Sequence, residues 1–246
     1  MIERILEIET GDGKMETFVA HPEQGGPFPA VVLYMDAPGI REELYDFVRR
    51  VATVGYYCMV PDQYYRQGKV RFDLGAISEE LRRKWRAARD KVSNAMIVED
   101  ARALLAFMEK GEPVRRGPKG CIGYCMGGRF ALAAAGAFPE AFRASASLHG
   151  TELITDRADS PHLMAHRFQG ELYLGFAEND PHVPLEEVER LRGVFAGSPL
   201  KHRIEVHPGT EHGYSFPAWP TYQKAAAERN WERIFAMFRR QIPPAA

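Results

Sequence analysis

Buried apolar runs alternate with helical patterns along most of this chain, and no other feature restricts its fold as strongly. The residues from Pro29 to Met35 form a nearly continuous apolar run, and Leu44, Phe47 and Val51 follow it at helical spacing. The same succession of a strand and a helix recurs toward the C-terminus. Strands that alternate with helices form a parallel sheet covered on both faces. We therefore predict an α/β fold, with a mostly parallel central sheet of about eight strands and helices on both faces.

The remaining elements follow the same two patterns. Strands are predicted at residues 56–60, 119–124, 144–148, 170–176 and 202–206, and helices at 97–108, 127–138, 184–195 and 221–240. Ahead of the parallel part, residues 4–10 and 15–21 flank Gly11-Asp12-Gly13, which is the pattern of a β-hairpin. No repeat, low-complexity tract or flexible linker divides the chain, so residues 1–246 are predicted to form a single domain.

Composition excludes several classes of protein. The chain has 32 Lys and Arg against 33 Asp and Glu, so no broad basic surface is expected for a nucleic acid or an anionic membrane. No segment has the roughly 18 consecutive apolar residues of a membrane span, and charges interrupt the start of the chain where a signal peptide is apolar. Three cysteines are too few for a disulfide framework. We expect a cytoplasmic protein, monomeric or homodimeric, whose partner is a small molecule.

The turn after the strand at 119–124 has the pattern of a nucleophile elbow, Gly-x-Cys-x-Gly, centred on Cys125. In such a turn the nucleophile adopts a strained backbone conformation, and side chains two residues before and after it would strike neighbouring backbone. Gly123 and Gly127 avoid this clash. The next helix begins at the cysteine, and its free N–H groups and dipole favour a thiolate. The alternative, a buried cysteine beside flexible glycines, does not explain why the motif joins a strand to a helix.

Two further strand ends supply an acid and a base. Asp180 lies in the polar turn after one strand, where Glu178 is the competing acid and a helix N-cap is the other role for Asp180. His212 lies in a glycine-flanked loop after the last strand, whereas the competing His207 lies at the end of that strand, beside a proline. We predict that Asp180 orients His212 and that His212 is the general base. The order nucleophile, acid, base along the chain is that of the α/β-hydrolase architecture.

Together these motifs resemble the dienelactone hydrolase family over nearly the whole chain. The resemblance is carried by Met35-Asp36-Ala37-Pro38-Gly39-Ile40, Gly123-Tyr124-Cys125-Met126-Gly127-Gly128, Asn179-Asp180 and Glu211-His212-Gly213. It implies a catalytic triad of Cys125, Asp180 and His212. It also implies an oxyanion hole formed by the backbone N–H groups of Ala37 and Met126. The chemistry that it implies is thiolate attack on an ester or lactone carbonyl, through an acyl-enzyme intermediate.

Two positions depart from the pattern of the family's type members. Those members carry a glutamate that handles the proton of the nucleophile, and this chain has the shorter Asp36 in its place. Asp36 either supports the nucleophile or only forms the turn before Ala37. The type members also hold a substrate carboxylate with an arginine four residues beyond the catalytic histidine, where this chain has Phe216. Dienelactone itself is therefore left open as the substrate.

The substrate pocket is predicted from aromatic and basic residues. Tyr64, Trp85, Tyr214 and Phe216 are the predicted substrate-binding side chains, and they favour a hydrophobic cyclic ester. Residues 63–94 form a longer link than an α/β connection needs, and Lys and Arg gather in it around Trp85. This basic segment is either a solvated helix face or an anion-binding lid over the site.

We predict a hydrolase that cleaves a lactone or small carboxylic ester through a Cys-His-Asp triad. The chain lacks the motifs for zinc, nucleotide phosphates and dinucleotides, so no metal and no cofactor is expected. Of the other histidines, His149 follows a central strand and could line the site, whereas His182 is expected to be an ordinary surface or packing residue. Two alternatives stay open: a hydrolase-fold protein that binds a ligand without turnover, and a thiol amidase or peptidase on the same scaffold.

Overall fold

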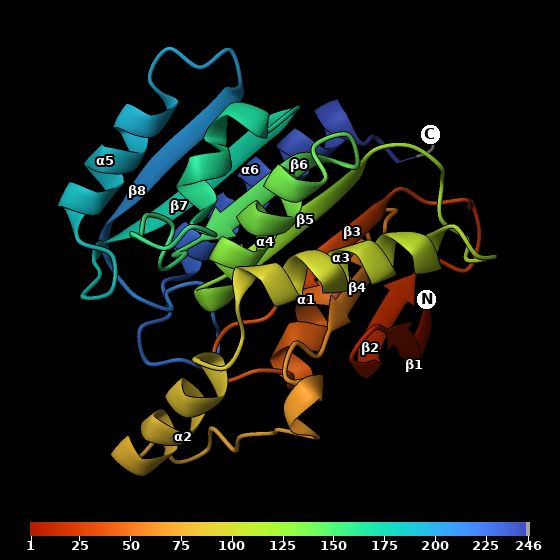
Figure 1. Cartoon of the computed structure of the whole chain (residues 1–246), viewed down its shortest axis with the longest axis horizontal. Helices are drawn as coiled ribbons and strands as arrows, with labels where there is room; N and C mark the ends of the chain where they lie inside the picture. Colours follow the sequence, from red (N-terminus) through yellow and green to blue (C-terminus); the bar gives the residue numbers. More distant parts are fainter. Residues whose placement is uncertain (245–246) are drawn as a thin grey trace.

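One eight-stranded sheet with the strand order β1-β2-β4-β3-β5-β6-β7-β8 runs through the molecule (Figure 1). The computed structural model describes residues 1–244, so residues 245 and 246 of the predicted domain lie outside the described residues. The strands are β1 Ile2–Thr10, β2 Gly13–His21, β3 Ala30–Tyr34, β4 Tyr57–Pro61, β5 Lys119–Tyr124, β6 Phe142–Leu148, β7 Glu171–Asn179 and β8 Lys201–Glu211. β2 is antiparallel to both β1 and β4, and the other neighbours are parallel. The predicted sheet is confirmed.

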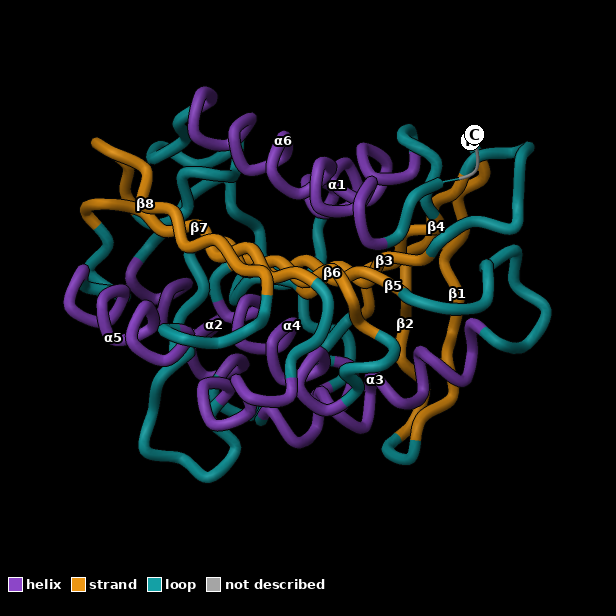
Figure 2. Tube along the Cα trace, turned by 90° about the horizontal axis from the view of Figure 1, so that it is seen from above, coloured by secondary structure: helices purple, strands orange, loops and turns teal. Residues whose placement is uncertain are grey.

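Helices cover both faces of this sheet, as predicted. α1 and α6 lie on one face, and α3, α4 and α5 lie on the other (Figure 2). The helices are α1 Glu42–Ala52, α2 Glu79–Arg89, α3 Asn94–Met108, α4 Met126–Ala137, α5 Leu185–Phe195 and α6 Lys224–Gln241. α2 projects from the body of the molecule (Figure 1). Within residues 1–244, none of the helices combines the length and the apolar character needed to cross a lipid bilayer.

The burial of the strands explains why their sequences are apolar. Every residue of β3, β4 and β5 is buried, because helices pack on both faces of the middle of the sheet. β1 lies at the edge of the sheet and is mostly exposed. α1 turns Leu44, Phe47, Val48 and Val51 toward the sheet and leaves its other residues more accessible. The core thus lies between the sheet and the two helical layers.

The register of the three central strands brings their carboxyl ends together. Tyr34 of β3 pairs with Gly123 of β5, and Tyr124 of β5 pairs with Leu148 of β6. Because these strands are parallel and end side by side, the three loops that follow them meet at one edge of the sheet. In open α/β sheets this edge is where ligands bind.

Two elements near this edge differ from the predicted boundaries. β8 continues to Glu211 rather than ending at residue 206, because it pairs with β7 as far as Asn179. α6 starts at Lys224 rather than at residue 221, because the Thr221 hydroxyl donates a hydrogen bond to the His212 carbonyl at 2.9 Å. The loop that carries His212 therefore spans residues 212–223 and is tied near its far end by Thr221.

Candidate active site

Cys125 lies at the sharp turn between β5 and α4. Its φ of 51° and ψ of −118° are strained values for a residue other than glycine. A Cβ at Gly123 would lie 1.9 Å from the carbonyl oxygen of Gly127, and one at Gly127 would lie 2.3 Å from that of Tyr34. The backbone passes so closely here that both positions require glycine. Cys125 itself is partly exposed at the tip of the turn, as a nucleophile elbow requires.

His212 and Asp180 form a hydrogen-bonded pair next to Cys125. The Nδ1 atom of His212 lies 2.7 Å from Oδ2 of Asp180, whose side chain is fully buried. Asp180 also accepts a hydrogen bond from the backbone N–H of His182, at 2.8 Å. Burial lowers the pKa of His212, but Cys125 and Asp180 outweigh burial and raise the pKa to about 10. His212 therefore holds a proton at neutral pH, which it can transfer to a leaving group.

The two competing residues make other contacts. Glu178 is exposed at the end of β7 and accepts a hydrogen bond from the N–H of Gly209 at 2.8 Å. His207 is buried within β8, and its Nε2 lies 2.8 Å from Oδ1 of Asn230 on α6. These contacts give Glu178 and His207 structural roles.

The loop after β3 and the start of α4 each contain a backbone N–H group without an acceptor among the described residues. The Tyr64 hydroxyl donates a hydrogen bond to the carbonyl of Ala37 at 2.6 Å, and the Gly39 N–H donates one to the carbonyl of Asp36 at 2.9 Å. Among the described residues, the N–H groups of Ala37 and Met126 have no acceptor. Met126 is the first residue of α4, where helical N–H groups lack an intrahelical partner. Two such groups could stabilise an oxyanion.

Asp36 is paired with an arginine that was not predicted. The Nη1 and Nη2 atoms of Arg41 lie 2.5 Å and 3.0 Å from the two carboxylate oxygens of Asp36. The Arg41 guanidinium also lies 4.8 Å above the centre of the Phe216 ring. Burial lowers the pKa of Arg41, but Asp36 and Glu43 outweigh it and raise the pKa above the usual value. A carboxylate held by an arginine that also contacts Glu43, rather than a free carboxylate, therefore stands at the position predicted to support the nucleophile.

Two further histidines flank His212. The rings of His149 and His182 lie with their centres 4.9 Å and 4.8 Å from that of His212, both in T-shaped contacts. His149 is fully buried, its φ is 38°, and neither ring nitrogen has a partner among the described residues. Burial and the nearby His212 lower the pKa of both rings, that of His149 well below 6.5. His182 is exposed, as expected of a surface residue, and it also lines the cavity beside Cys125, which was not expected.

A cavity of about 180 Å³ lies beside Cys125. Its lining comprises Asp36, Ala37, Pro38, Arg82, Trp85, Arg86, Arg89, Cys125, His149, Thr151, Glu152, His182, His212, Gly213, Phe216 and Trp219. Of the four predicted substrate-binding residues, Trp85 and Phe216 line this cavity, whereas Tyr64 and Tyr214 are fully buried behind it. The Tyr214 hydroxyl instead accepts a hydrogen bond from Asn230 at 2.9 Å. In the part of the chain that the structure describes, no three His, Cys, Asp or Glu side chains could hold a metal ion.

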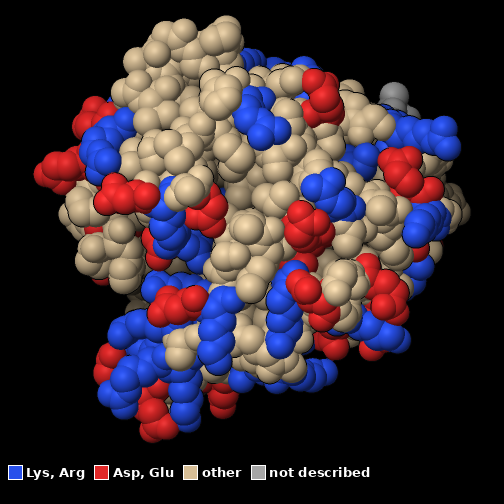
Figure 3. All heavy atoms as spheres, in the orientation of Figure 1, with Lys and Arg blue, Asp and Glu red and all other residues tan. Residues whose placement is uncertain are grey.

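The basic link forms one wall of the cavity. Ser78 caps α2 by accepting a hydrogen bond from the N–H of Leu81 at 3.1 Å, and Trp85 is buried beneath the helix. Lys and Arg gather on the surface over α2 (Figure 3). Because three arginines of this segment line the cavity, the structure favours a lid over a purely solvated helix face.

Comparison with known sequences identifies the family of the chain. The sequence pattern of the Dienelactone hydrolase family matches residues 15–242. A protein of Synechocystis sp. named "Putative carboxymethylenebutenolidase" is 27% identical over 228 residues, which cover 92% of this chain and 91% of that protein.

Solved structures show the same fold. The crystal structure of a "Putative Dienelactone Hydrolase" from Klebsiella pneumoniae has a TM-score of 0.85 at 22% identity and covers 96% of this chain and 98% of its own. The Dienelactone Hydrolase-like Promiscuous Phospotriesterase P91 from metagenomic libraries has a TM-score of 0.80 at 21% identity and covers 98% of both chains. With a family match over nearly its whole length, this chain is a hydrolase that belongs to the dienelactone hydrolase family.

Proposed function

We propose that this chain hydrolyses lactones or small carboxylic esters through a triad of Cys125, His212 and Asp180. The observation that carries the proposal is the position of His212, which contacts Asp180 through Nδ1 and lines the same cavity as Cys125. A nucleophile, a base and an orienting acid in this order are the parts that acyl transfer needs.

In the first half of the reaction, the Cys125 sulfur attacks the carbonyl carbon of the substrate. The carbonyl π electrons move to oxygen, and the N–H groups of Ala37 and Met126, which have no acceptor among the described residues, bind the resulting oxyanion. When the tetrahedral intermediate collapses, the C–O bond to the alcohol breaks. His212 donates its proton to the leaving oxygen, and a thioester to Cys125 remains. In a lactone, the alcohol stays attached to the acyl group.

In the second half, water attacks the thioester. Neutral His212 takes a proton from the water, and Asp180 stabilises the imidazolium that forms. Collapse of the second intermediate breaks the C–S bond and releases the carboxylic acid. The sulfur leaves with the electron pair of that bond, beside protonated His212, and the free enzyme is regenerated.

The cavity supports a small substrate. Its volume of about 180 Å³ is below the roughly 300–1,000 Å³ typical of sites for drug-sized ligands. Trp85, Phe216 and Trp219 supply apolar walls, and the α2 arginines supply positive charge. An uncharged or singly anionic ester suits these walls. The cytoplasmic location and the choice between monomer and homodimer stay predictions from the sequence.

A substrate panel tests the proposal. Lactones, aryl esters and peptide amides are compared by kcat/KM with the wild type and with Cys125→Ala. We expect turnover of lactones and esters, weak or no turnover of amides, and loss of activity in Cys125→Ala. Cys58→Ala is the matched control, because Cys58 is a buried thiol in β4 and not in the cavity lining. Undiminished activity of Cys125→Ala would refute the triad.

The same panel separates the alternatives. Preferential cleavage of amides would indicate the thiol amidase or peptidase. No turnover of any class, together with binding of a lactone or ester, would indicate a protein that binds without turnover.

A further inference from the structure

Glu152 borders the catalytic cavity from the loop after β6. The N–H of the preceding residue, Thr151, donates a hydrogen bond to the carbonyl of Cys125 at 3.2 Å, so this loop is tied to the elbow. The φ of Glu152 is 56°, which places it in the left-handed region that residues other than glycine seldom occupy. Strain of this kind is retained where the surrounding structure holds a side chain in a required direction.

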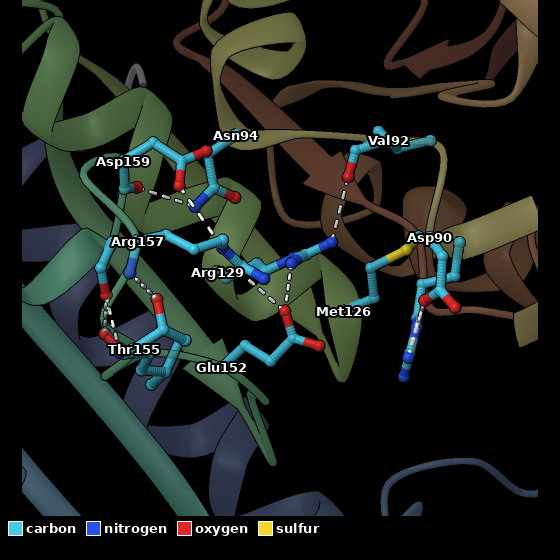
Figure 4. Close-up of polar contacts among 12 residues, drawn as sticks. Asp90, Val92, Asn94, Met126, Arg129, Glu152, Thr155, Arg157 and Asp159 are labelled. Atoms are coloured by element: carbon cyan, nitrogen blue, oxygen red, sulfur yellow. Dashed lines mark hydrogen bonds and ion pairs between the residues drawn. The ribbon is translucent and has the colours of Figure 1, made fainter.

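Two arginines hold the Glu152 carboxylate by a single oxygen. Arg129 and Arg157 both contact Oε2, with the Arg157 Nη2 atom at 2.8 Å, and Figure 4 shows both contacts converging on that oxygen. The Arg129 side chain is itself buried, and it also donates a hydrogen bond to the carbonyl of Val92 at 3.1 Å. Among residues 1–244, Oε1 of Glu152 has no hydrogen-bond or ion-pair partner. These two arginines, which we call the clamp, therefore fix the carboxylate of Glu152 and leave its Oε1 atom without a hydrogen bond.

Glu152 lies between the two arginines and the catalytic cavity. Arg129 and Arg157 line a second cavity, of about 300 Å³, and are absent from the lining of the catalytic one. Glu152 borders both cavities, and its side chain is 31% exposed. Its carboxylate is therefore held by the arginines of one cavity at the wall of the other.

The charge of Glu152 determines what it can bind. Burial raises the pKa of Glu152, but Arg129 and Arg157 outweigh it and lower the pKa below the usual value, so the carboxylate is ionised at neutral pH. An ionised carboxylate only accepts hydrogen bonds. It attracts a donor and repels a second carboxylate. Arg82, Arg86 and Arg89 line the same cavity, so a substrate ammonium would meet several positive charges there. A neutral hydroxyl group can donate a hydrogen bond to the carboxylate, and the arginines do not repel it.

We propose that Glu152 is a specificity-determining residue whose free oxygen accepts a hydrogen bond from a hydroxyl group on the substrate. The inference rests on the proposed hydrolysis of lactones and esters, and it narrows their class to hydroxylactones and hydroxyesters. Glu152 takes no part in bond making or breaking. It orients the hydroxylated part of the substrate, while Cys125 attacks the carbonyl carbon.

Matched lactones test the inference. The kcat/KM values of γ-butyrolactone and of its 2-hydroxy and 3-hydroxy derivatives are measured by acid release at constant pH. We expect the wild type to prefer at least one hydroxylactone over the parent by about tenfold, the lower end for a hydrogen bond to a charged group. Glu152→Ala should bring this ratio close to one, and Glu152→Gln should give an intermediate ratio because the amide oxygen still accepts.

Two further variants separate recognition from a purely structural role. Arg157→Ala removes the exposed half of the clamp and keeps the free oxygen, so the preference should persist in reduced form. Glu189→Gln removes an exposed carboxylate on α5 and should keep the wild-type ratio. The ratio compares two substrates on one protein, so a smaller folded fraction does not change it.

Each outcome bears on a defined claim. A wild type that hydrolyses all three lactones without preference would overturn the inference and leave the proposed function standing. An unchanged ratio in Glu152→Ala would also overturn it. A stronger preference for the cationic 2-amino lactone would contradict a hydroxyl as the recognised group. Hydrolysis of no lactone or ester at all would overturn the proposed function and the inference with it.

Discussion

Replacing Asp180 with asparagine tests how the triad is held together. The substitution keeps the size of the side chain and removes the charge that faces Nδ1 of His212 at 2.7 Å. A hydrogen bond to a charged group contributes about 1.5–3 kcal/mol, and full burial of Asp180 leaves no solvent to replace it. At about 1.4 kcal/mol per factor of ten, we expect kcat/KM to fall by about 10-fold to 100-fold from this bond alone. A wrongly oriented imidazole would add to the loss.

The same variant changes the pH dependence in a defined direction. Acylation needs protonated His212, so wild-type activity should be lost as the pH rises through about 10, the pKa of His212. Asp180 is one of the groups that raise this pKa, so Asp180→Asn should move the alkaline limb to lower pH. The assay is kcat/KM for γ-butyrolactone between pH 6 and pH 11, measured by acid release at constant pH, because its alkoxide leaving group needs the proton of His212 and kcat/KM reports on the free enzyme.

Glu178→Gln is the matched control for this experiment. Glu178 lies two residues before Asp180, but its carboxylate accepts a hydrogen bond from the Gly209 N–H instead of facing His212. The Glu178→Gln variant should keep both the wild-type rate and the wild-type pH profile. If Glu178→Gln shows the loss and the shift while Asp180→Asn behaves like the wild type, the assignment of the acid is wrong.

Two further predictions concern the elbow and the thiols. Gly127→Ala would place a Cβ 2.3 Å from the Tyr34 carbonyl oxygen, so the free energy of unfolding, measured with urea, should fall by about 3 kcal/mol or more. An unchanged midpoint of unfolding would contradict this steric clash. Iodoacetamide should label Cys125 before Cys58 and Cys121, because both of these are buried and burial raises their pKa, that of Cys121 to about 12. Peptide mapping over time measures the three rates, and equal rates would count against a reactive Cys125.

The sheet and the elbow could be predicted because their signals are local. Apolar runs and helical spacing reflect which residues of an element are buried. Both patterns are visible in the sequence itself. The elbow could be predicted because steric exclusion leaves only glycine at positions 123 and 127. Chain order then placed Asp180 and His212 after neighbouring strands, whose ends must meet at one edge of a parallel sheet.

The walls of the cavity could not be predicted in the same way. Tyr214 and Phe216 lie two residues apart in an irregular loop, where no periodicity determines which side chain faces the cavity. The pairing of Asp36 with Arg41 depends on the path of the loop, and the sequence signal is only an arginine shortly after an acid. His182 lies against His212 in a T-shaped ring contact, which depends on how the loops after β7 and β8 pack together. These positions follow from packing rather than from pattern.

The central claim is that Cys125 carries the acyl group during hydrolysis. The most direct measurement is mass spectrometry of the protein quenched during turnover of p-nitrophenyl acetate, followed by peptide mapping. We expect one added acetyl group on the peptide that contains Cys125, and neither the acetyl group nor turnover in Cys125→Ala. An acetyl group on another residue, with Cys125→Ala as active as the wild type, would contradict it.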